Sequence, residues 1–193
     1  MPPKAKFTKE EIISSALNIV KSNGLSALTA RALGNSLGCS SRPVFTVFSS
    51  MDEVEEEVIK KAKEIYKTEY VEKGLKQEIP FKGVGTEYIK FAESEPKLFQ
   101  LLFMREVDSG ADINSVLGII EESYELILNS IVSYYGLSVP CAEKLYKHLW
   151  IYTHGIAVLI ATNVCNFTGE EISLMLTEVF IGLLKKLKTE DDV

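Results

Sequence analysis

The stretch GCSSRPVFTVFSS near the N-terminus combines side chains that can contact a DNA groove. Arg42 offers a guanidinium for guanine or phosphate, and Ser41 offers a hydroxyl for phosphate. Phe45 and Thr46 offer apolar contact to a thymine methyl group. These four side chains point outward together only if the stretch is helical, so its local fold decides whether they form a reading surface.

Proline has a permitted place in such a helix. If Ser40 is the N-cap residue, Pro43 is the third helical residue, whose amide would have no intrahelical partner in any case. Pro43 also disfavours helical dihedral angles at Arg42, so the first turn is expected to be tightened or distorted. The spacing predicts a short helix over 41–47.

A second helix is predicted directly before it, over about 29–37, with Gly38 as its stop signal. Two helices joined by this turn have the spacing of a helix-turn-helix, whose second helix enters the major groove. The apolar side chains that would pack its interior are Leu33, Leu37, Val44, Val47 and Phe48. Short helices joined by a glycine turn also occur in α-bundles that bind no DNA, so this unit alone leaves both interpretations open.

Charge is distributed unevenly along the 193 residues. Residues 1–50 carry six Lys or Arg and two Glu, whereas the rest of the chain carries 15 basic and 25 acidic residues. A basic segment on an acidic chain is typical of a polyanion-binding region, although such asymmetry also arises by chance in solvated surfaces. The overall net charge of −6 therefore does not exclude DNA as a partner.

Helical periodicity runs almost throughout the chain and strand alternation is nearly absent, which predicts an all-α protein of about nine helices. The predicted helices outside the helix-turn-helix span about 9–23, 50–73, 86–94, 96–106, 113–135, 139–165 and 169–188. Capping boxes beginning at Thr8, Ser50 and Thr168 mark three helix starts. Residues 74–85, which hold Pro80 and three glycines, are the predicted loop or hinge.

Residues 8–54 resemble the DNA-binding region of the tetracycline-repressor-like (TetR) family of transcriptional regulators. The resemblance rests on Thr29 with Arg31 two residues later, on LGCS at 37–40 and on VFTVF at 44–48, followed by SMD. The order and spacing of the family pattern hold across this segment without a gap. The resemblance implies a helix-turn-helix DNA-binding domain over 1–50 and a helical effector-binding and dimerisation domain over 51–193.

Three positions depart from the family pattern where DNA contacts are usual. Phe45 replaces a common tyrosine, Val47 replaces a tyrosine or histidine, and Met51 replaces a lysine. The basic side chains available to compensate for lost phosphate contacts are Lys6, Lys9 and Arg42. The residues expected to contact DNA are Thr29, Arg31, Ser40, Ser41, Arg42, Pro43, Phe45 and Thr46.

The resemblance also implies an effector cavity in the helical body, where Trp150 and the pair His154-Gly155 are similar to a signature of one family branch. The residues implied for this cavity are Phe91, Phe99, Phe103, Tyr124, Trp150 and His154, with Tyr152 nearby in sequence. Aromatic side chains at helical spacing also occur as plain core. A mostly apolar wall would favour a hydrophobic or aromatic effector.

The last two predicted helices would, by the same resemblance, form a four-helix bundle with a second copy of the chain. The expected interface residues are Ile172, Leu176, Val179, Phe180, Leu183 and Leu187, with Leu184 alongside. This apolar stripe is wider than the surface helix of a monomer needs, and burial within one subunit is the alternative. A two-fold dimer would present two DNA-binding domains to a palindromic operator.

We therefore predict a ligand-responsive transcriptional regulator, a repressor, that binds operator DNA as a homodimer in the cytoplasm. We expect no catalytic residues, cofactor, metal site or membrane-spanning segment. Ser94-Glu-Pro-Lys97 matches one motif of penicillin-binding enzymes but lacks its companion motifs, and His148 and His154 have no acidic or Cys partner at metal spacing. The alternative is an all-α module that binds a small molecule or another protein and has lost operator binding.

Overall fold

The computed structural model describes residues 6–105 and 124–191, and helices make up most of both ranges. No β-strand occurs within these two ranges, which confirms the predicted all-α fold. None of the helices there is long and apolar enough to cross a membrane. The chain divides into two compact units, the head unit (Met1–Tyr66 with Glu95–Arg105) and the body unit (Lys67–Ser94 with Glu106–Val193).

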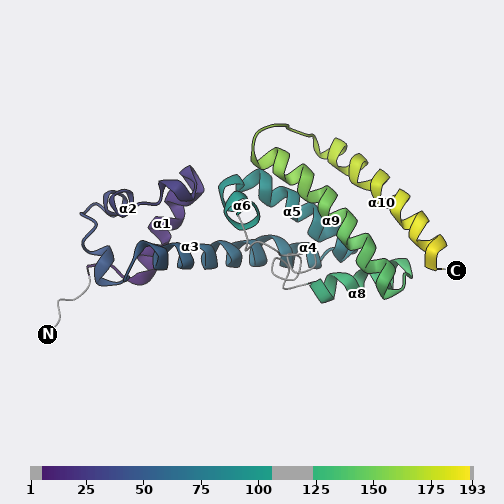
Figure 1. Cartoon of the computed structure of the whole chain (residues 1–193), viewed down its shortest axis with the longest axis horizontal. Helices are drawn as coiled ribbons and strands as arrows, with labels where there is room; N and C mark the ends of the chain where they lie inside the picture. Colours follow the sequence, from purple (N-terminus) through teal and green to yellow (C-terminus); the bar gives the residue numbers. More distant parts are fainter. Residues whose placement is uncertain (1–5, 106–123, 192–193) are drawn as a thin grey trace. The chain divides into compact units, whose positions relative to one another are not determined.

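The head unit is organised around its first helix. Its helices are α1 (Lys9–Asn23), α2 (Ala30–Ser36), α3 (Met51–Tyr66) and α6 (Pro96–Phe103). Helix α1 contacts α2, α3 and α6, and α3 also contacts α6 (Figure 1). The side chains of Ile12, Leu33, Val54 and Leu98, one from each helix, are fully buried. The head unit thus includes α6, a helix that comes later in the sequence than the other three.

The body unit packs around α9 (Val139–Ala161), which lies between α5 (Pro80–Ser94) and α10 (Gly169–Asp191) in Figure 1. Helix α9 contacts α5, α10 and α8 (Tyr124–Tyr135), and α5 also contacts α4 (Glu72–Leu75). Fully buried aliphatic side chains from α8 and α9 form the centre of this core. The predicted helix over 113–135 is confirmed from residue 124 on, and its earlier part lies outside the described residues.

Local capping signals predicted two helix starts correctly and a third in part. At α1, the Thr8 hydroxyl accepts from the Glu11 amide at 3.2 Å, and the Glu11 carboxylate accepts from the Thr8 amide at 2.8 Å. The Thr168 box at α10 is formed in the same way. At α3 the Ser50 hydroxyl caps Glu53, but the Glu53 carboxylate accepts from the amide and hydroxyl of Ser49, which together offer it two donors.

The predicted loop over 74–85 is wrong for most of its length. Helix α5 begins at Pro80, where a missing amide costs nothing, and Gly74 belongs to α4. A Cβ added to Gly74 would lie 2.6 Å from the Val84 backbone nitrogen, and one added to Gly83 would collide with the Gly74 carbonyl. These two glycines therefore serve close helix packing rather than a turn.

The helix predicted to run from 50 to 73 is interrupted. Helix α3 ends at Tyr66, a π-helical segment covers Lys67–Val71, and α4 follows directly. Nothing in the apolar periodicity predicts the π segment. The boundary between the head and body units falls at its first residue.

Candidate functional site

The turn after α2 is fixed by two glycines. Thr29 caps α2 by accepting from the Ala32 amide at 3.1 Å. Gly38 has φ +65°, a left-handed conformation that favours glycine, and ends the helix. A Cβ on Gly34 would lie 2.8 Å from the Ser41 backbone nitrogen, so only a glycine lets the turn cross α2 this closely. Sequence reasoning identified Gly38 but missed Gly34.

The predicted helix over 41–47 is wrong in type and start. The structure has a single 3₁₀ turn, Val44–Thr46, preceded by Pro43 in a helical conformation at φ −62° and ψ −28°. The Val44 amide donates to the Ser41 carbonyl at 3.1 Å, and no described bond links Ser40 to the Arg42 amide. Proline has no amide to donate and disfavours a helical Arg42, so helical geometry begins only at the proline.

The interior of this unit is nevertheless as predicted. Leu33 and Val44 are fully buried and Phe48 is nearly so. Leu37 and Val47 are partly buried. The apolar residues predicted to pack the helix-turn-helix are therefore buried or partly buried, although its second helix is a single turn.

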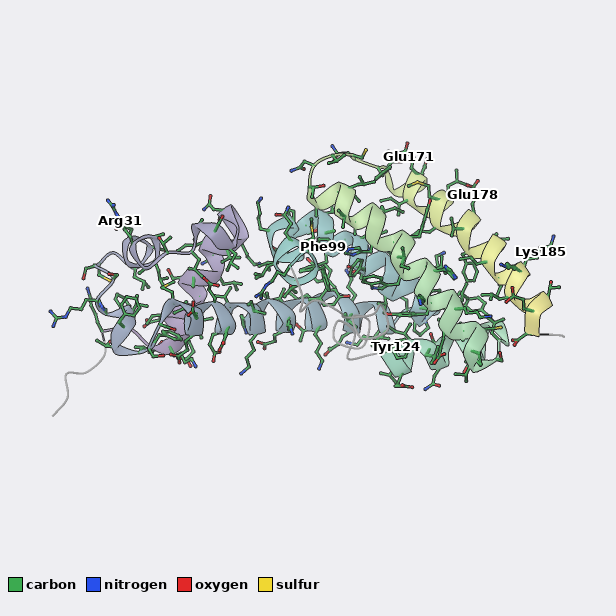
Figure 2. All side chains as sticks on the ribbon, in the orientation of Figure 1. Arg31, Phe99, Tyr124, Glu171, Glu178 and Lys185 are labelled. Carbon is green, nitrogen blue, oxygen red and sulfur yellow. The ribbon has the colours of Figure 1, made fainter. Side chains whose placement is uncertain are left out.

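Six of the eight predicted DNA-contacting residues are exposed. Thr29, Arg31, Ser40, Arg42, Phe45 and Thr46 are exposed, whereas Ser41 and Pro43 are partly buried. Figure 2 shows the Arg31 side chain projecting outward from the head unit. In the described part of the chain neither Arg31 nor Arg42 forms an ion pair, and the Phe45 ring is 45% exposed. The Thr46 hydroxyl donates to the Pro43 carbonyl at 2.7 Å.

Lys9, which the sequence offers as a compensating phosphate contact, has a protein partner instead. Its ammonium lies 2.8 Å from the Glu57 carboxylate and 5.5 Å from the centre of the Phe48 ring. The hydrogen bond to Glu57 raises the pKa of Lys9. A DNA phosphate would have to compete with Glu57, so Arg42 carries more of the expected electrostatic contact than Lys9.

The aromatic residues expected around an effector cavity fall in both units. Phe99 and Phe103 belong to the head unit, where their ring centres are 5.1 Å apart and Phe99 is fully buried. Phe91 and Tyr124 belong to the body unit. Phe91 is fully buried with its ring 4.9 Å from that of Tyr70, and Tyr124 lies edge-on to Tyr146 at 5.2 Å. Phe91 and Phe99 thus contribute to the cores of different units.

Trp150 and His154 form a tight group with a third residue, Tyr88. The Trp150 and His154 rings are stacked, 4.8 Å apart and 7° from parallel, and the Tyr88 hydroxyl lies 2.8 Å from His154 Nδ1. Trp150 Nε1 is buried and has no hydrogen-bond partner among the described residues. An unsatisfied buried donor costs about 1–3 kcal/mol, so this nitrogen is a ready donor for a bound acceptor. Tyr88 was missed because only the α5–α9 contact brings it to His154.

The apolar side chains of α10 divide between a side that packs on the core of its own unit and a side that is exposed. Leu187 is buried, and Val179, Phe180 and Leu183 are partly buried against the core of their own unit. Ile172 and Leu176 are also partly buried. The burial of these six side chains corresponds to the alternative interpretation, in which the stripe packs within one subunit. Leu174 and Ile181 are 60% and 57% exposed. Figure 2 shows Glu171, Glu178 and Lys185 along the outer side of α10. Leu174 and Ile181 follow Glu171 and Glu178 by three residues each, which places them on the neighbouring, exposed surface of the helix.

Comparison with known proteins supports the fold assignment. No model of a known protein family matches the sequence, and no curated protein matches it. The crystal structure of apo ActR from Streptomyces coelicolor, a TetR-family regulator, matches 97% of this chain and 100% of that chain, with a TM-score of 0.51 and 17% identity. The chain has a TetR-like fold. At this identity the similarity establishes the fold alone.

The burial of His154 predicts a pH dependence of the protein's stability. Burial lowers the pKa of His154, so its native value lies below that of the unfolded chain, which is about 6.5. The free energy of unfolding therefore keeps its full value above about pH 6.5. It decreases as the pH falls toward and through the native pKa of His154, because the unfolded chain takes up a proton more readily than the native protein. His154→Gln is expected to reduce the loss of unfolding free energy between about pH 7.5 and about pH 5.5.

Urea denaturation followed by circular dichroism at the two pH values measures this loss. His148→Gln is the matched control, because His148 is the other histidine of the sequence and is exposed. The control is expected to keep the native pH dependence. An identical pH dependence in the native protein and the His154 variant would contradict the prediction.

Proposed function

We propose that this protein is a DNA-binding transcriptional regulator that acts as a homodimer, represses its target and responds to a small molecule. The observation that carries the proposal is the exposed surface of the head unit around Arg31 and Arg42. Both guanidiniums lie on a packed helix-turn-helix-like unit without ion-pair partners among the described residues. Charged groups left free in this way are available to phosphate and base edges.

The chemistry of this surface supports a duplex groove as its partner. Arg42 precedes the 3₁₀ turn that carries Phe45 and Thr46, so a cation and an apolar ring occur on one short exposed segment. Arginine binds guanine or phosphate with two parallel hydrogen bonds, whereas an exposed aromatic ring suits a thymine methyl group. A protein partner would also suit the exposed Phe45, but it would not require two arginines without ion-pair partners among the described residues of the same helix-turn-helix-like unit.

A homodimer is proposed from the outer side of α10. Leu174 and Ile181 on α10 and Ile151 on α9, which is 48% exposed, leave apolar area uncovered on adjacent helices. Cβ atoms added to Gly155 and Gly182 would meet nothing within 4 Å, so the described part of the chain covers neither helix at these glycines. Two copies related by a two-fold axis would bury this area and present two head units to a palindromic operator.

The effector is proposed to be hydrophobic or aromatic and to carry one hydrogen-bond acceptor. The stacked Trp150–His154 pair offers aromatic surface, and Trp150 Nε1 offers a buried donor without a partner in the described part of the chain. Effector binding would favour a conformation whose two head units no longer match both half-sites. This requires tighter effector binding to that conformation than to the DNA-bound one.

The first test is a gel shift with the DNA that flanks the protein's own coding sequence, titrated with salt. Arg42→Ala is expected to weaken binding about tenfold or more, since one good arginine contact contributes about 1–3 kcal/mol, and to flatten the salt dependence by about one charge. The matched control is Lys63→Ala, which removes an exposed cation near the far end of α3. It is expected to bind as the native protein does.

Two results would contradict this function. Absence of salt-dependent, sequence-specific binding by the native protein would favour an all-α module that binds a small molecule or another protein. Equal loss of affinity in the Arg42 and Lys63 variants would show that net charge alone, rather than the Arg42 surface, governs the contact with DNA.

A further inference from the structure

Lys9 lies beside the surface that is proposed to bind DNA. Its ammonium is 5.5 Å from the centre of the Phe48 ring, and Phe48 follows the exposed turn Val44–Thr46 by two residues. The Phe48 amide donates to the Val44 carbonyl at 3.0 Å, so the ring and the turn belong to one locally bonded segment. The Lys9 side chain is 43% exposed. This cation therefore lies close to the backbone of any duplex that contacts the turn.

The carboxylate of Glu57 already binds this cation within the head unit. Lys9 is the first residue of α1, Glu57 lies in the second turn of α3, and the two helices pack against each other. Lys9 Nζ donates to Glu57 Oε1 at 2.8 Å, which is a charge-assisted hydrogen bond. This bond raises the pKa of Lys9 and lowers the pKa of Glu57. Lys9 is thus a cation whose charge is matched by an anion of its own unit.

The start of α3 adds further negative charge around the ion pair. Residues 51–57 contain five acidic side chains and no basic one. Attraction to Glu53 adds to the effect of Glu57 in raising the pKa of Lys9, although the Glu53 carboxylate itself accepts two hydrogen bonds from Ser49. In the described part of the chain, Glu57 is the acidic side chain that pairs directly with Lys9. Glu57 therefore decides whether Lys9 is available to a phosphate.

A carboxylate and a phosphate compete for the same ammonium. Both accept charge-assisted hydrogen bonds, and lysine binds either of them as a point charge. DNA releases condensed counterions only where a protein cation neutralises a phosphate, so a lysine that keeps its internal partner adds nothing to this release. An exposed ion pair contributes little to stability, so its replacement is expected to leave the fold intact.

We propose that Glu57 acts as an internal substitute for a DNA phosphate. Its carboxylate keeps Lys9 out of the contact with DNA and so lowers the affinity of the head unit for any duplex. This inference rests on the proposed function, which assigns DNA to this surface. Because phosphate contacts carry no sequence information, Glu57 lowers the affinity for operator DNA and for unrelated DNA by the same factor.

Gel shifts of the whole chain, titrated with salt, test this role on two duplexes. One is the DNA that flanks the coding sequence, and the other is a shuffled sequence of equal length. Glu57→Gln keeps the shape of the side chain and removes its charge. It is expected to tighten binding to both duplexes at least about threefold at about 100 mM salt, and to steepen the slope of log K against log salt by about one. Adding Lys9→Gln to this variant is expected to restore the native affinity and slope.

Two controls separate the release of Lys9 from a general loss of negative charge. Glu56→Gln removes the same charge one residue earlier, at an exposed side chain that forms no ion pair among the described residues. It is expected to change either affinity less than about twofold, because salt screens an exposed charge that holds no cation. Lys9→Gln alone is expected to leave the salt slope unchanged, because Lys9 contacts no phosphate while Glu57 is present.

Equal tightening by Glu56→Gln and Glu57→Gln, or a gain that persists when Lys9 is also replaced, would overturn the role of Glu57. Native affinity of Glu57→Gln for both duplexes would overturn it as well. If every protein binds the two duplexes equally well, the proposed sequence-specific regulator fails, whereas tighter, Lys9-dependent binding by Glu57→Gln still supports this inference. Absence of binding by all of these proteins would overturn both.

Discussion

Replacing Gly83 with alanine is expected to lower the free energy of unfolding by about 1–3 kcal/mol, the usual cost of forcing extra atoms into a packed interface. Alanine at an interior helical position normally stabilises by up to about 1 kcal/mol relative to glycine. At Gly83 the steric term exceeds this gain, because the new Cβ would collide with the Gly74 carbonyl, a backbone atom with no freedom to move aside. Urea denaturation followed by circular dichroism gives the two free energies.

Gly85 provides the matched control two residues along α5. A Cβ at Gly85 meets nothing within 4 Å, so Gly85→Ala is expected to stabilise by about 0.5–1 kcal/mol. The two substitutions are chemically identical and lie in one helix, yet they have opposite expected signs. If both stabilised the protein, α4 and α5 would not meet at glycine as the structure shows.

Replacing Ile181 with glutamate is expected to convert the proposed homodimer to a monomer. Ile181 is 57% exposed on the outer side of α10, so the substitution costs the isolated subunit little. In a two-fold interface each copy would contribute the new charge, so both carboxylates would be transferred out of water without partners. Size-exclusion chromatography with light scattering measures the mass directly. Operator affinity is expected to fall when the subunits separate.

Leu126→Glu is the matched control for the dimer. Leu126 is 62% exposed on α8, so it offers a similar apolar side chain on a helix to which no dimer contact is assigned. This variant is expected to keep the native mass. A native protein that is monomeric at micromolar concentration, or a dimer unaffected by Ile181→Glu, would remove α10 as the interface.

Features determined by neighbouring residues were predicted from the sequence. The capping pairs at Thr8 and Thr168 form because hydroxyl and carboxylate lie three residues apart on one chain segment. Gly38 ends α2 for an equally local reason, its positive φ. The fold class followed from such signals, since helical periodicity also concerns only residues within a few turns.

Features that depend on contacts between distant segments were not predicted. The ion pair of Lys9 with Glu57 changes the interpretation of a basic side chain that the sequence offered to DNA. In the sequence Gly74 and Gly83 resemble turn residues, whereas in the structure they lie where α4 and α5 meet. Pro43 was expected as the third residue of a helix beginning at Ser41, but in the structure it directly precedes a single 3₁₀ turn, Val44–Thr46.

The stacked pair Trp150–His154 allows the intrinsic tryptophan fluorescence of the protein to report on this one site. Trp150 is the single tryptophan of the sequence, and its indole ring lies 4.8 Å from an imidazole. All tryptophan emission therefore originates beside the His154 imidazole and from the indole whose nitrogen is proposed to bind the effector. Protonation of the imidazole and occupation of the indole nitrogen both alter the environment of this one fluorophore, so small-molecule libraries can be screened on the unlabelled protein.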